Sequence, residues 1–333
     1  MNKRIMITGG AGFIGSNLLC CLHEKYPEAN FLNIDKLSYA SDLSYLSSVK
    51  DSNRYTFKKL DIVDRDAVRD IIRTYEPDGV FHLAAESHVD NSIKGPEPFI
   101  QSNVVGTFNL IEECRQFWQR KGKLDSHRFL HVSTDEVYGE LGDDGAFSEE
   151  TPYAPNSPYS ASKAGSDFIV RSYFHTYGMN VVTTNCSNNF GPHQHDEKLI
   201  PTVIRTALEE DDIPVYGKGE NVRDWLYVQD HCEALDLAYQ KGRAGETYTI
   251  GGDNEWKNID LVKKICDILN EEHPSGSVSD YKELITFVTD RPGHDFRYAI
   301  DASKIKRELG WSPSDSFEAH LRKTIRWYIE RYQ

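Results

Sequence analysis

The sequence predicts an α/β protein built on a doubly wound parallel sheet, with a smaller α/β domain toward the C-terminus. In the first half, short runs rich in Ile, Val, Phe and Leu alternate with segments of helical periodicity. Near-continuous apolar strands that alternate with helices are typical of a parallel sheet covered on both faces. After Gly191-Pro192 loops become frequent, and Pro and Gly cluster over 214–219. This change of character predicts a second, smaller unit.

The individual elements follow from these runs. The first predicted helix carries apolar residues three and four apart, at Ile14, Leu18 and Leu22, and a similar pattern covers 104–111. A longer helix is predicted over 159–177. The predicted strands are 4–8, 31–34, 55–60, 80–83, 128–132 and 180–185.

The predicted domains are discontinuous. Residues 1–190 form the larger domain, and 226–256 are expected to return to it through a helix near 226–239 and a strand at 247–250. Residues 191–225 and 257–333 form the smaller domain, with terminal helices over 304–311 and 317–332. The sequence contains no internal repeat and no low-complexity tract.

Composition excludes several classes of protein. A net charge of −14 without a basic stripe argues against a nucleic-acid partner. No segment approaches the ~18 apolar residues of a membrane span, and the first apolar run is too short for a signal peptide. The six cysteines include no Cys-x-x-Cys pair, which argues against a disulfide framework or zinc site. We therefore expect a cytoplasmic protein with no membrane partner.

A glycine-rich turn joins the first strand to the first helix. Gly9, Gly12 and Gly15 in Thr8-Gly9-Gly10-Ala11-Gly12-Phe13-Ile14-Gly15 permit a tight turn, close approach of a pyrophosphate and close helix packing. Twenty residues after Gly15, Asp35 ends the second strand, where a carboxylate accepts the hydroxyls of an adenosine ribose and repels a 2′-phosphate. A Rossmann-type site for NAD is predicted, rather than a glycine turn without a ligand.

Other strand ends extend the predicted cofactor site. Lys36 follows Asp35 directly and leaves NADP open as an alternative. Asp61-Ile62 follow the third strand and Leu83-Ala84-Ala85 follow the fourth, where the adenine and the nicotinamide ribose are expected to lie.

A second group of residues predicts redox and proton chemistry. Tyr159 and Lys163 lie one helical turn apart, where an ammonium favours the phenolate that takes a proton from an alcohol. Thr134, after the fifth strand, is placed to hold the alcohol oxygen. Asp135 and Glu136 add carboxyl groups that hydride transfer alone does not need. Taken singly, each motif also fits a surface Tyr-Lys pair or a solvated acidic turn.

Together these motifs resemble the extended short-chain dehydrogenase/reductase family, and within it the dTDP-glucose 4,6-dehydratases of dTDP-rhamnose biosynthesis. In related sugar-nucleotide 4-epimerases the positions of Asp135 and Glu136 are typically uncharged. In UDP-glucuronate decarboxylases and GDP-mannose dehydratases Ser usually replaces the Asp. The segments that carry the resemblance are 83–90, 133–139, 159–163, 187–192, 197–201, 221–225 and 290–294.

The resemblance implies a reaction and a set of roles. Tyr159 and tightly bound NAD oxidise C4 of dTDP-glucose, Glu136 removes the C5 proton, and protonated Asp135 gives its proton to the departing C6 hydroxyl. It implies a homodimer that pairs the helices at 104–118 and 159–177. It adds Ser102 and Asn189 to the cofactor site and no metal. The implied substrate-binding residues are Ser87, Thr134, Asn188, Glu197, Lys198, Leu199, Pro214, Tyr216, Arg223, Asn258, Arg291 and His294.

The chain also departs from the family pattern. His193-Gln194-His195-Asp196 stands where Tyr-Gln-Phe-Pro is usual, Asn91 replaces an Arg, and Ser41 replaces a Gly. A polar loop is the interpretation of 193–196, since no further ligand has the spacing of a metal site. The alternatives to a dTDP-glucose dehydratase are another NAD-retaining sugar-nucleotide enzyme and a non-catalytic NAD-binding sensor.

Overall fold

The computed structural model describes residues 3–333 and centres on a seven-stranded sheet in which every pairing is parallel. The strand order is β10-β6-β5-β4-β1-β2-β3. The predicted doubly wound α/β fold is confirmed. The strands are β1 (Arg4–Thr8), β2 (Asn30–Asp35), β3 (Tyr55–Lys59), β4 (Gly79–His82), β5 (Arg128–Thr134), β6 (Val181–Cys186) and β10 (Thr247–Ile250).

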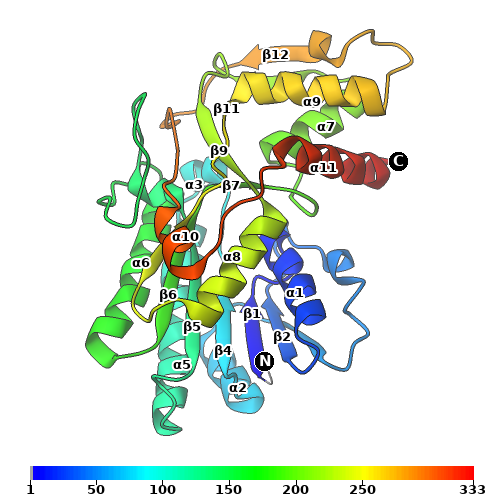
Figure 1. The fold of residues 1–333 in the computed structure, drawn as a ribbon. Helices are drawn as coiled ribbons and strands as arrows, with labels where there is room; N and C mark the ends of the chain where they lie inside the picture. The colour runs from blue at the N-terminus through cyan, green and yellow to red at the C-terminus, as the bar shows by residue number, and fades with distance from the viewer. Residues whose placement is uncertain (1–2) are drawn as a thin grey trace.

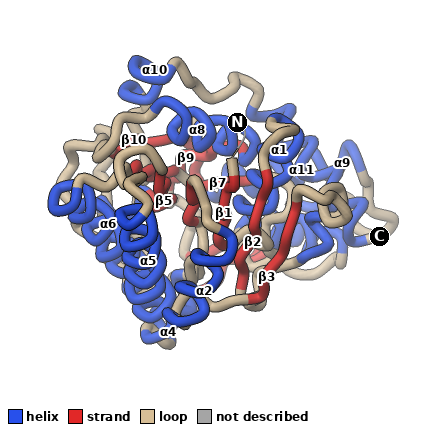
Figure 2. Tube along the Cα trace, turned by 90° about the horizontal axis from the view of Figure 1, so that it is seen from below, coloured by secondary structure: helices blue, strands red, loops and turns tan. Residues whose placement is uncertain are grey.

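Helices cover both faces of this sheet, as Figure 2 shows. On one face, α1 (Phe13–Lys25) and α8 (Val228–Lys241) pack together, and on the other, α2 (Arg65–Tyr75), α5 (Thr107–Arg120) and α6 (Pro158–Tyr177) form a layer. Each face has its own apolar core. Burial on both faces explains why the central strands are apolar along their whole length.

The second part of the structure lies over the carboxyl ends of the large sheet (Figure 1). It contains a three-stranded sheet in the order β11-β9-β7 and a parallel pair of β8 with β12. Its elements are β7 (Asn188–Phe190), α7 (Leu199–Leu208), β8 (Ile213–Tyr216), β9 (Val222–Tyr227), β11 (Glu255–Lys257), α9 (Asn258–Glu272), η4 (Tyr281–Leu284), β12 (Ile285–Val288) and α11 (Phe317–Tyr332). The helix α10 (Ser303–Leu309) packs instead against α8 and β10.

The helix α6 begins at a strong sequence signal. The Ser157 hydroxyl accepts from the Ser160 backbone N–H at 3.0 Å, and the Ser160 hydroxyl accepts from the Ser157 backbone N–H at 2.9 Å. Pro158 occupies the first turn, and Gly178 ends the helix with φ of 67°. This cap fixes where Tyr159 and Lys163 stand.

The helix predicted from residue 104 onward begins within a π-helical segment. This segment, η2 (Ile100–Gly106), leads directly into α5. Within it the buried Asn103 side chain accepts from the Glu86 N–H at 2.8 Å and donates to the Ser162 hydroxyl on α6 at 2.8 Å. Such segments occur often at functional sites, and this one places Ser102 at a cavity. The other short elements are η1 (Leu43–Leu46), α3 (Val89–Lys94), α4 (Glu97–Phe99) and η3 (Asp135–Tyr138).

The helices of residues 3–333 do not resemble membrane spans. None of them combines the length and the apolar character that crossing a bilayer requires.

Candidate active site

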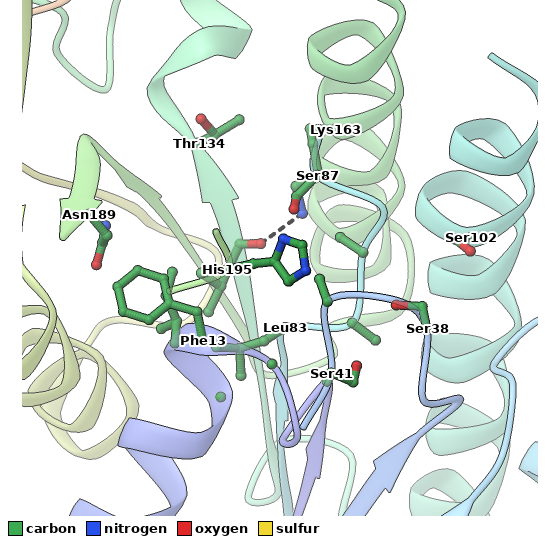
Figure 3. Close-up of a pocket in the computed structure, with 18 of the residues that line it drawn as sticks. Phe13, Ser38, Ser41, Leu83, Ser87, Ser102, Thr134, Lys163, Asn189 and His195 are labelled. Carbon is green, nitrogen blue, oxygen red and sulfur yellow. Dashed lines mark hydrogen bonds between the residues drawn. The ribbon is translucent and has the colours of Figure 1, made fainter. Parts of the chain in front are cut away.

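A cavity opens at the carboxyl ends of β1, β4, β5 and β6 and has a volume of about 290 Å³. Every residue predicted for the cofactor and for catalysis lines it, and Figure 3 shows Phe13, Thr134, Lys163 and Asn189 around it. In open α/β sheets ligands bind at this end of the strands. The lining residues from the prediction are Gly9, Gly12, Phe13, Ile14, Gly15, Asp35, Lys36, Asp61, Ile62, Leu83, Ala84, Ala85, Ser102, Thr134, Asp135, Glu136, Tyr159, Lys163 and Asn189.

Glycine is required in the first turn for steric reasons. Gly9 has φ of 73°, and a Cβ there would lie 2.7 Å from the Ala84 nitrogen. A Cβ on Gly15 would lie 2.1 Å from the Gly9 carbonyl oxygen. Gly12 precedes α1 without a side-chain cap, so the first N–H groups of the helix face a cavity that suits a phosphate.

Asp35 and Lys36 sit in different electrostatic settings. The Asp35 carboxylate accepts from the Ala11 N–H at 3.0 Å, the Leu37 N–H at 2.8 Å and the Ser41 hydroxyl at 3.0 Å. The Lys36 ammonium forms an ion pair with Glu86 at 2.6 Å and donates to the Ser102 hydroxyl at 3.0 Å. Because Lys36 is paired with Glu86 while Asp35 lines the cavity, this side of the cavity favours a ribose hydroxyl over a 2′-phosphate.

The redox pair is arranged differently from the sequence-based expectation. Lys163 donates to the Val132 carbonyl oxygen at 2.8 Å, and burial lowers the pKa of its ammonium. Burial raises the pKa of the Tyr159 phenol well above its ordinary value, with Glu136 and Cys186 adding to the rise and a hydrogen bond with Thr134 opposing it. In the cofactor-free protein the phenol is therefore protonated.

The two carboxyl groups follow Thr134 on a single turn, η3. The Thr134 hydroxyl accepts from the Glu136 N–H at 3.3 Å and donates to Asp135 Oδ1 at 3.3 Å. Asp135 Oδ2 is buried without a hydrogen-bond partner among the described residues. A buried carboxyl with one oxygen that accepts no hydrogen bond is more stable when protonated.

The surroundings of the two carboxyl groups shift their pKa values by different causes. Burial raises the pKa of Asp135 well above its ordinary value, and the Glu136 and Asp224 carboxylates raise it further, against the effect of Arg223. Burial also raises the pKa of Glu136, but the positive charges of Arg291, Lys198 and Arg223 oppose that rise. Asp135 is thus suited to donate a proton and Glu136 to accept one.

The predicted substrate-binding residues fall into two groups. Ser87, Asn188, Glu197 and Lys198 line the cavity beside Thr134, and the Lys198 ammonium donates to the Ser87 carbonyl oxygen at 3.2 Å. Seven others do not line it: Leu199, Pro214, Tyr216, Arg223, Asn258, Arg291 and His294.

Several of these seven lie just beyond the cavity. Tyr216 donates to Asp90 Oδ2 at 3.2 Å and Arg291 to Asp90 Oδ1 at 3.3 Å. The His294 ring lies against the Tyr216 ring, with centroids 6.2 Å apart. Arg223 is buried, donates to the Asp295 carbonyl oxygen at 2.8 Å and stacks on Tyr298.

Several residues that line the cavity were not predicted from the sequence. Most of them adjoin a predicted motif or follow the end of a parallel strand, and such a position by itself indicates a place near the ligand. Others come from the altered loop, whose course the sequence does not define. They are Ile34, Ser38, Ala40, Ser41, Leu60, Val132, Ser133, Cys186, Ser187, Gln194 and His195.

The loop 193–197 closes one side of the cavity. His193 has φ of 76°, stacks on Tyr45 with ring centroids 4.3 Å apart and bonds to the Ser16 hydroxyl at 2.9 Å. His195 contacts the Tyr39 ring edge-on, and the Tyr39 hydroxyl donates to Glu197 at 3.2 Å. The loop therefore connects the first helix with the segment after β2. Over residues 3–333, no group of three or more His, Cys, Asp or Glu has the arrangement of a metal site.

Comparison with known proteins agrees with this site. Residues 6–324 match the family model described as GDP-mannose 4,6 dehydratase. A dTDP-glucose 4,6-dehydratase of Salmonella typhimurium is 52% identical, over 99% of this chain and 94% of the relative. The dTDP-glucose 4,6-dehydratase 1 of Escherichia coli is also 52% identical, over 98% of this chain and 92% of the relative.

Solved structures show the same similarity. DesIV, a dTDP-glucose 4,6-dehydratase of Streptomyces venezuelae with NAD and TYD bound, has a TM-score of 0.89 and 43% identity, covering 98% of this chain and 97% of that one. A UDP-glucose 4-epimerase of Thermotoga maritima has a TM-score of 0.87 at 26% identity, covering 99% of this chain and 100% of that one. The chain belongs to the GDP-mannose 4,6-dehydratase family of sugar-nucleotide enzymes. Within it, the resemblance to the dTDP-glucose 4,6-dehydratases is confirmed.

The buried Asp135 predicts a pH-dependent change in stability. Its raised pKa means that the folded state binds the proton more tightly than the unfolded chain does, so this group's contribution to stability falls as pH rises from about 3.9 toward the folded value. Asp135→Asn should therefore raise the melting temperature at neutral pH, by about 2 °C or more, and should change it little in acid. Thermal unfolding followed by circular dichroism at both pH values tests this.

The exposed Asp144 provides the matched control. Asp144→Asn should leave the melting temperature unchanged at both pH values. A melting temperature of Asp135→Asn that falls at neutral pH would contradict the inferred state of Asp135.

Proposed function

We propose that the protein is a dTDP-glucose 4,6-dehydratase that converts dTDP-glucose into dTDP-4-keto-6-deoxyglucose and water with tightly bound NAD. The observation that carries the proposal is the pair Asp135-Glu136, which directly follows Thr134 in the cavity that also holds Tyr159 and Lys163. Relatives that are 52% identical over nearly the whole chain bear this enzyme's name.

The cavity residues fit NAD. The Gly9–Gly15 turn and the uncapped start of α1 would hold the pyrophosphate, and Asp35 the adenosine ribose. Asp61, Ile62 and Leu83 line the expected base and ribose positions. When bound, NAD supplies a hydride acceptor for C4 and returns the hydride to C6, so it is restored within each turnover.

Tyr159 and Thr134 serve the oxidation of C4. The Thr134 hydroxyl orients the C4 oxygen of the sugar. Tyr159 accepts the proton of the C4 hydroxyl as the C4–H bond breaks. Burial opposes the phenolate, so the positive charges of Lys163 and of the oxidised nicotinamide must favour it in the complex. Cofactor binding thus prepares Tyr159 to act as a base.

Glu136 and Asp135 serve the elimination. The 4-keto group acidifies the C5 proton, which Glu136 accepts with its carboxylate. The C5 electron pair forms the C5–C6 double bond as the C6–O bond breaks, and the proton of Asp135 converts the leaving hydroxyl into water. After reduction at C6, Glu136, whose acid proton exchanges with solvent, protonates C5, and the proton held by Tyr159 replaces the one lost from Asp135.

The second part of the structure supplies cations for the substrate. Lys198, Arg223 and Arg291 act electrostatically on Glu136, so they surround the position where the sugar must lie. An arginine side chain binds two oxygens of a diphosphate at once. We infer that the larger domain holds NAD and that the smaller one holds the nucleotide sugar.

Incubation with dTDP-glucose tests the function, with UDP-glucose and CDP-glucose in parallel. We expect a 4-keto-6-deoxy product from dTDP-glucose, detected by its absorbance in alkali. The altered loop 193–196 makes the parallel substrates necessary, because it lines the cavity through Gln194 and His195. Product from UDP- or CDP-glucose alone would show a related sugar-nucleotide dehydratase, and no product from any of the three would exclude a dehydratase.

Glu136→Gln isolates the role of the second carboxyl group. The variant should lose exchange of the C5 proton with solvent and reduce kcat by about a hundredfold or more, because the amide cannot accept the proton. The dinucleotide should stay bound, since Glu136 is not expected to contact it. Mass spectrometry of the product formed in D2O and the NAD content of the purified variant provide the measurements. Unchanged turnover would remove Glu136 as the base.

We also infer a homodimer formed through α5, α6 and η2. These elements expose large apolar side chains, Ile100, Phe108, Phe168 and Tyr177, and such patches often mark interfaces. The chain has a mass of 38.0 kDa, and light scattering should give about twice that value.

The six free cysteines support a reducing, cytoplasmic location, where the product would enter dTDP-rhamnose biosynthesis.

Phe168→Arg should convert the dimer to a monomer, because a guanidinium is unfavourable at an apolar interface. Phe287→Arg is the matched control: Phe168 is 57% exposed on α6 and Phe287 is 58% exposed on β12, in the other part of the structure. Light scattering that gives a monomer for the unmodified chain, or a dimer for both variants, would contradict this interface.

A further inference from the structure

We propose that Asp167 is a positioning residue that holds the reactive ends of β5 and α6 in register. This inference rests on the proposed function, since it concerns how Thr134 and the Tyr159–Lys163 pair are kept in place. Asp167 does not line the cavity, and no step of the mechanism uses it. Its role follows from the number and origin of its contacts.

The Asp167 carboxylate receives hydrogen bonds from four side chains. His131 donates from Nε2 to Oδ1 at 3.0 Å. Oδ2 accepts from the Ser133 hydroxyl at 2.8 Å, the Tyr153 hydroxyl at 2.8 Å and the Asn185 amide at 3.3 Å. Asp167 is only 4% exposed, so this network is closed to solvent and each lost bond leaves a buried group unsatisfied.

Three consecutive residues of β5 are hydrogen-bonded to α6 or β6, and the Asp167 network includes the bonds of the last two, Ser133 and Thr134. The Val132 carbonyl oxygen accepts from the Lys163 ammonium at 2.8 Å. The Ser133 hydroxyl donates to Asp167 directly. The Thr134 carbonyl oxygen accepts from the Asn185 amide at 3.0 Å, and the same amide reaches Asp167. The carboxylate therefore fixes the strand end from which Thr134, Asp135 and Glu136 project.

The same carboxylate belongs to the reactive face of α6. Tyr159, Lys163 and Asp167 are spaced four residues apart, so they lie along one side of the helix. Asp167 is thus the third member of the row that begins with the redox pair. One carboxylate links that row to the carboxyl end of β5 and to β6.

The negative charge of Asp167 also raises the pKa of Lys163 more than any other nearby charge does. Burial lowers the pKa of Lys163, whereas Asp167 and then Cys186 raise it. His131 and His82 face the same region, and burial lowers the pKa of each, so both are neutral. Tyr153 and Tyr138 face Asp167, and burial raises the pKa of both phenols, so they too are neutral. Loss of the Asp167 charge should therefore favour the neutral amine of Lys163.

Asp167→Asn tests the proposal, with Tyr153→Phe as the matched variant that removes the Tyr153 hydrogen bonds with Asp167 and Asn185 but no charge. With dTDP-glucose and the NAD-loaded enzyme, Asp167→Asn should lower kcat by about tenfold to a hundredfold while KM changes little. The alkaline limb of reduced-nicotinamide formation should move to lower pH, because Lys163 loses its proton more easily. Asp167→Glu should restore part of kcat and the alkaline limb. Tyr153→Phe should lower kcat less and leave that limb in place.

A second measurement does not depend on turnover. Lys163 lines the cavity, so the pH dependence of its acetylation by acetic anhydride, followed by peptide mass spectrometry, reports its proton affinity directly. The midpoint should fall in Asp167→Asn and stay in Tyr153→Phe, whether or not dTDP-glucose is the substrate. This separates failure of the positioning role from failure of the proposed function.

Two results would overturn the proposal. One is an Asp167→Asn enzyme with unchanged kcat and an unchanged Lys163 midpoint. The other is a variant that loses activity only in proportion to folded protein, with the pH profile of the remaining enzyme unmoved, which would make Asp167 a structural residue alone. If Asp167→Asn does not fold, Ser133→Ala provides the test, because it removes one donor to the Asp167 carboxylate. Ser133→Ala should lower kcat at constant KM. An unchanged kcat would count against the proposal.

Discussion

The burial of two adjacent carboxyl groups is the constraint on which the rest of the site depends. Asp135 and Glu136 leave β5 together on one short turn, yet opposite proton transfers require different environments. Asp135 is enclosed, and its Oδ2 has no hydrogen-bond partner among residues 3–333, whereas three cations act on Glu136. Those cations come from the second part of the chain, so the site becomes complete only when that part is folded over the sheet.

Burying two adjacent carboxyl groups costs stability, because both lose their hydration. The protein compensates with networks that carry no chemistry themselves. The four donors to Asp167 and the cap of α6 restrict the strand end and the helix start to one relative position. A rigid frame keeps the two carboxyl groups in place despite the cost of burying them.

The cofactor side was predictable from sequence because its causes are local. Backbone sterics require glycine at Gly9 and Gly15, and a strand end places Asp35. The orientation of Lys163 toward Val132 and the partners of Asp167 were not predictable, because they join segments far apart in the chain. For the same reason the resemblance, and not the sequence pattern, indicated a substrate-binding role for Tyr216, Arg223 and Arg291. Only the structure shows that these three residues do not line the cavity around Thr134.

The ion pair between Lys36 and Glu86 has a consequence for redesign of cofactor preference. Replacement of Asp35 by a neutral residue would remove the repulsion of a 2′-phosphate but would leave the nearest ammonium engaged elsewhere. Its release requires a change at Glu86 as well, on the segment after β4 that also receives Asn103. A change in dinucleotide selectivity must therefore combine a substitution at the end of β2 with one in the segment after β4, where only the backbone of Glu86 holds Asn103 and the π-helical turn.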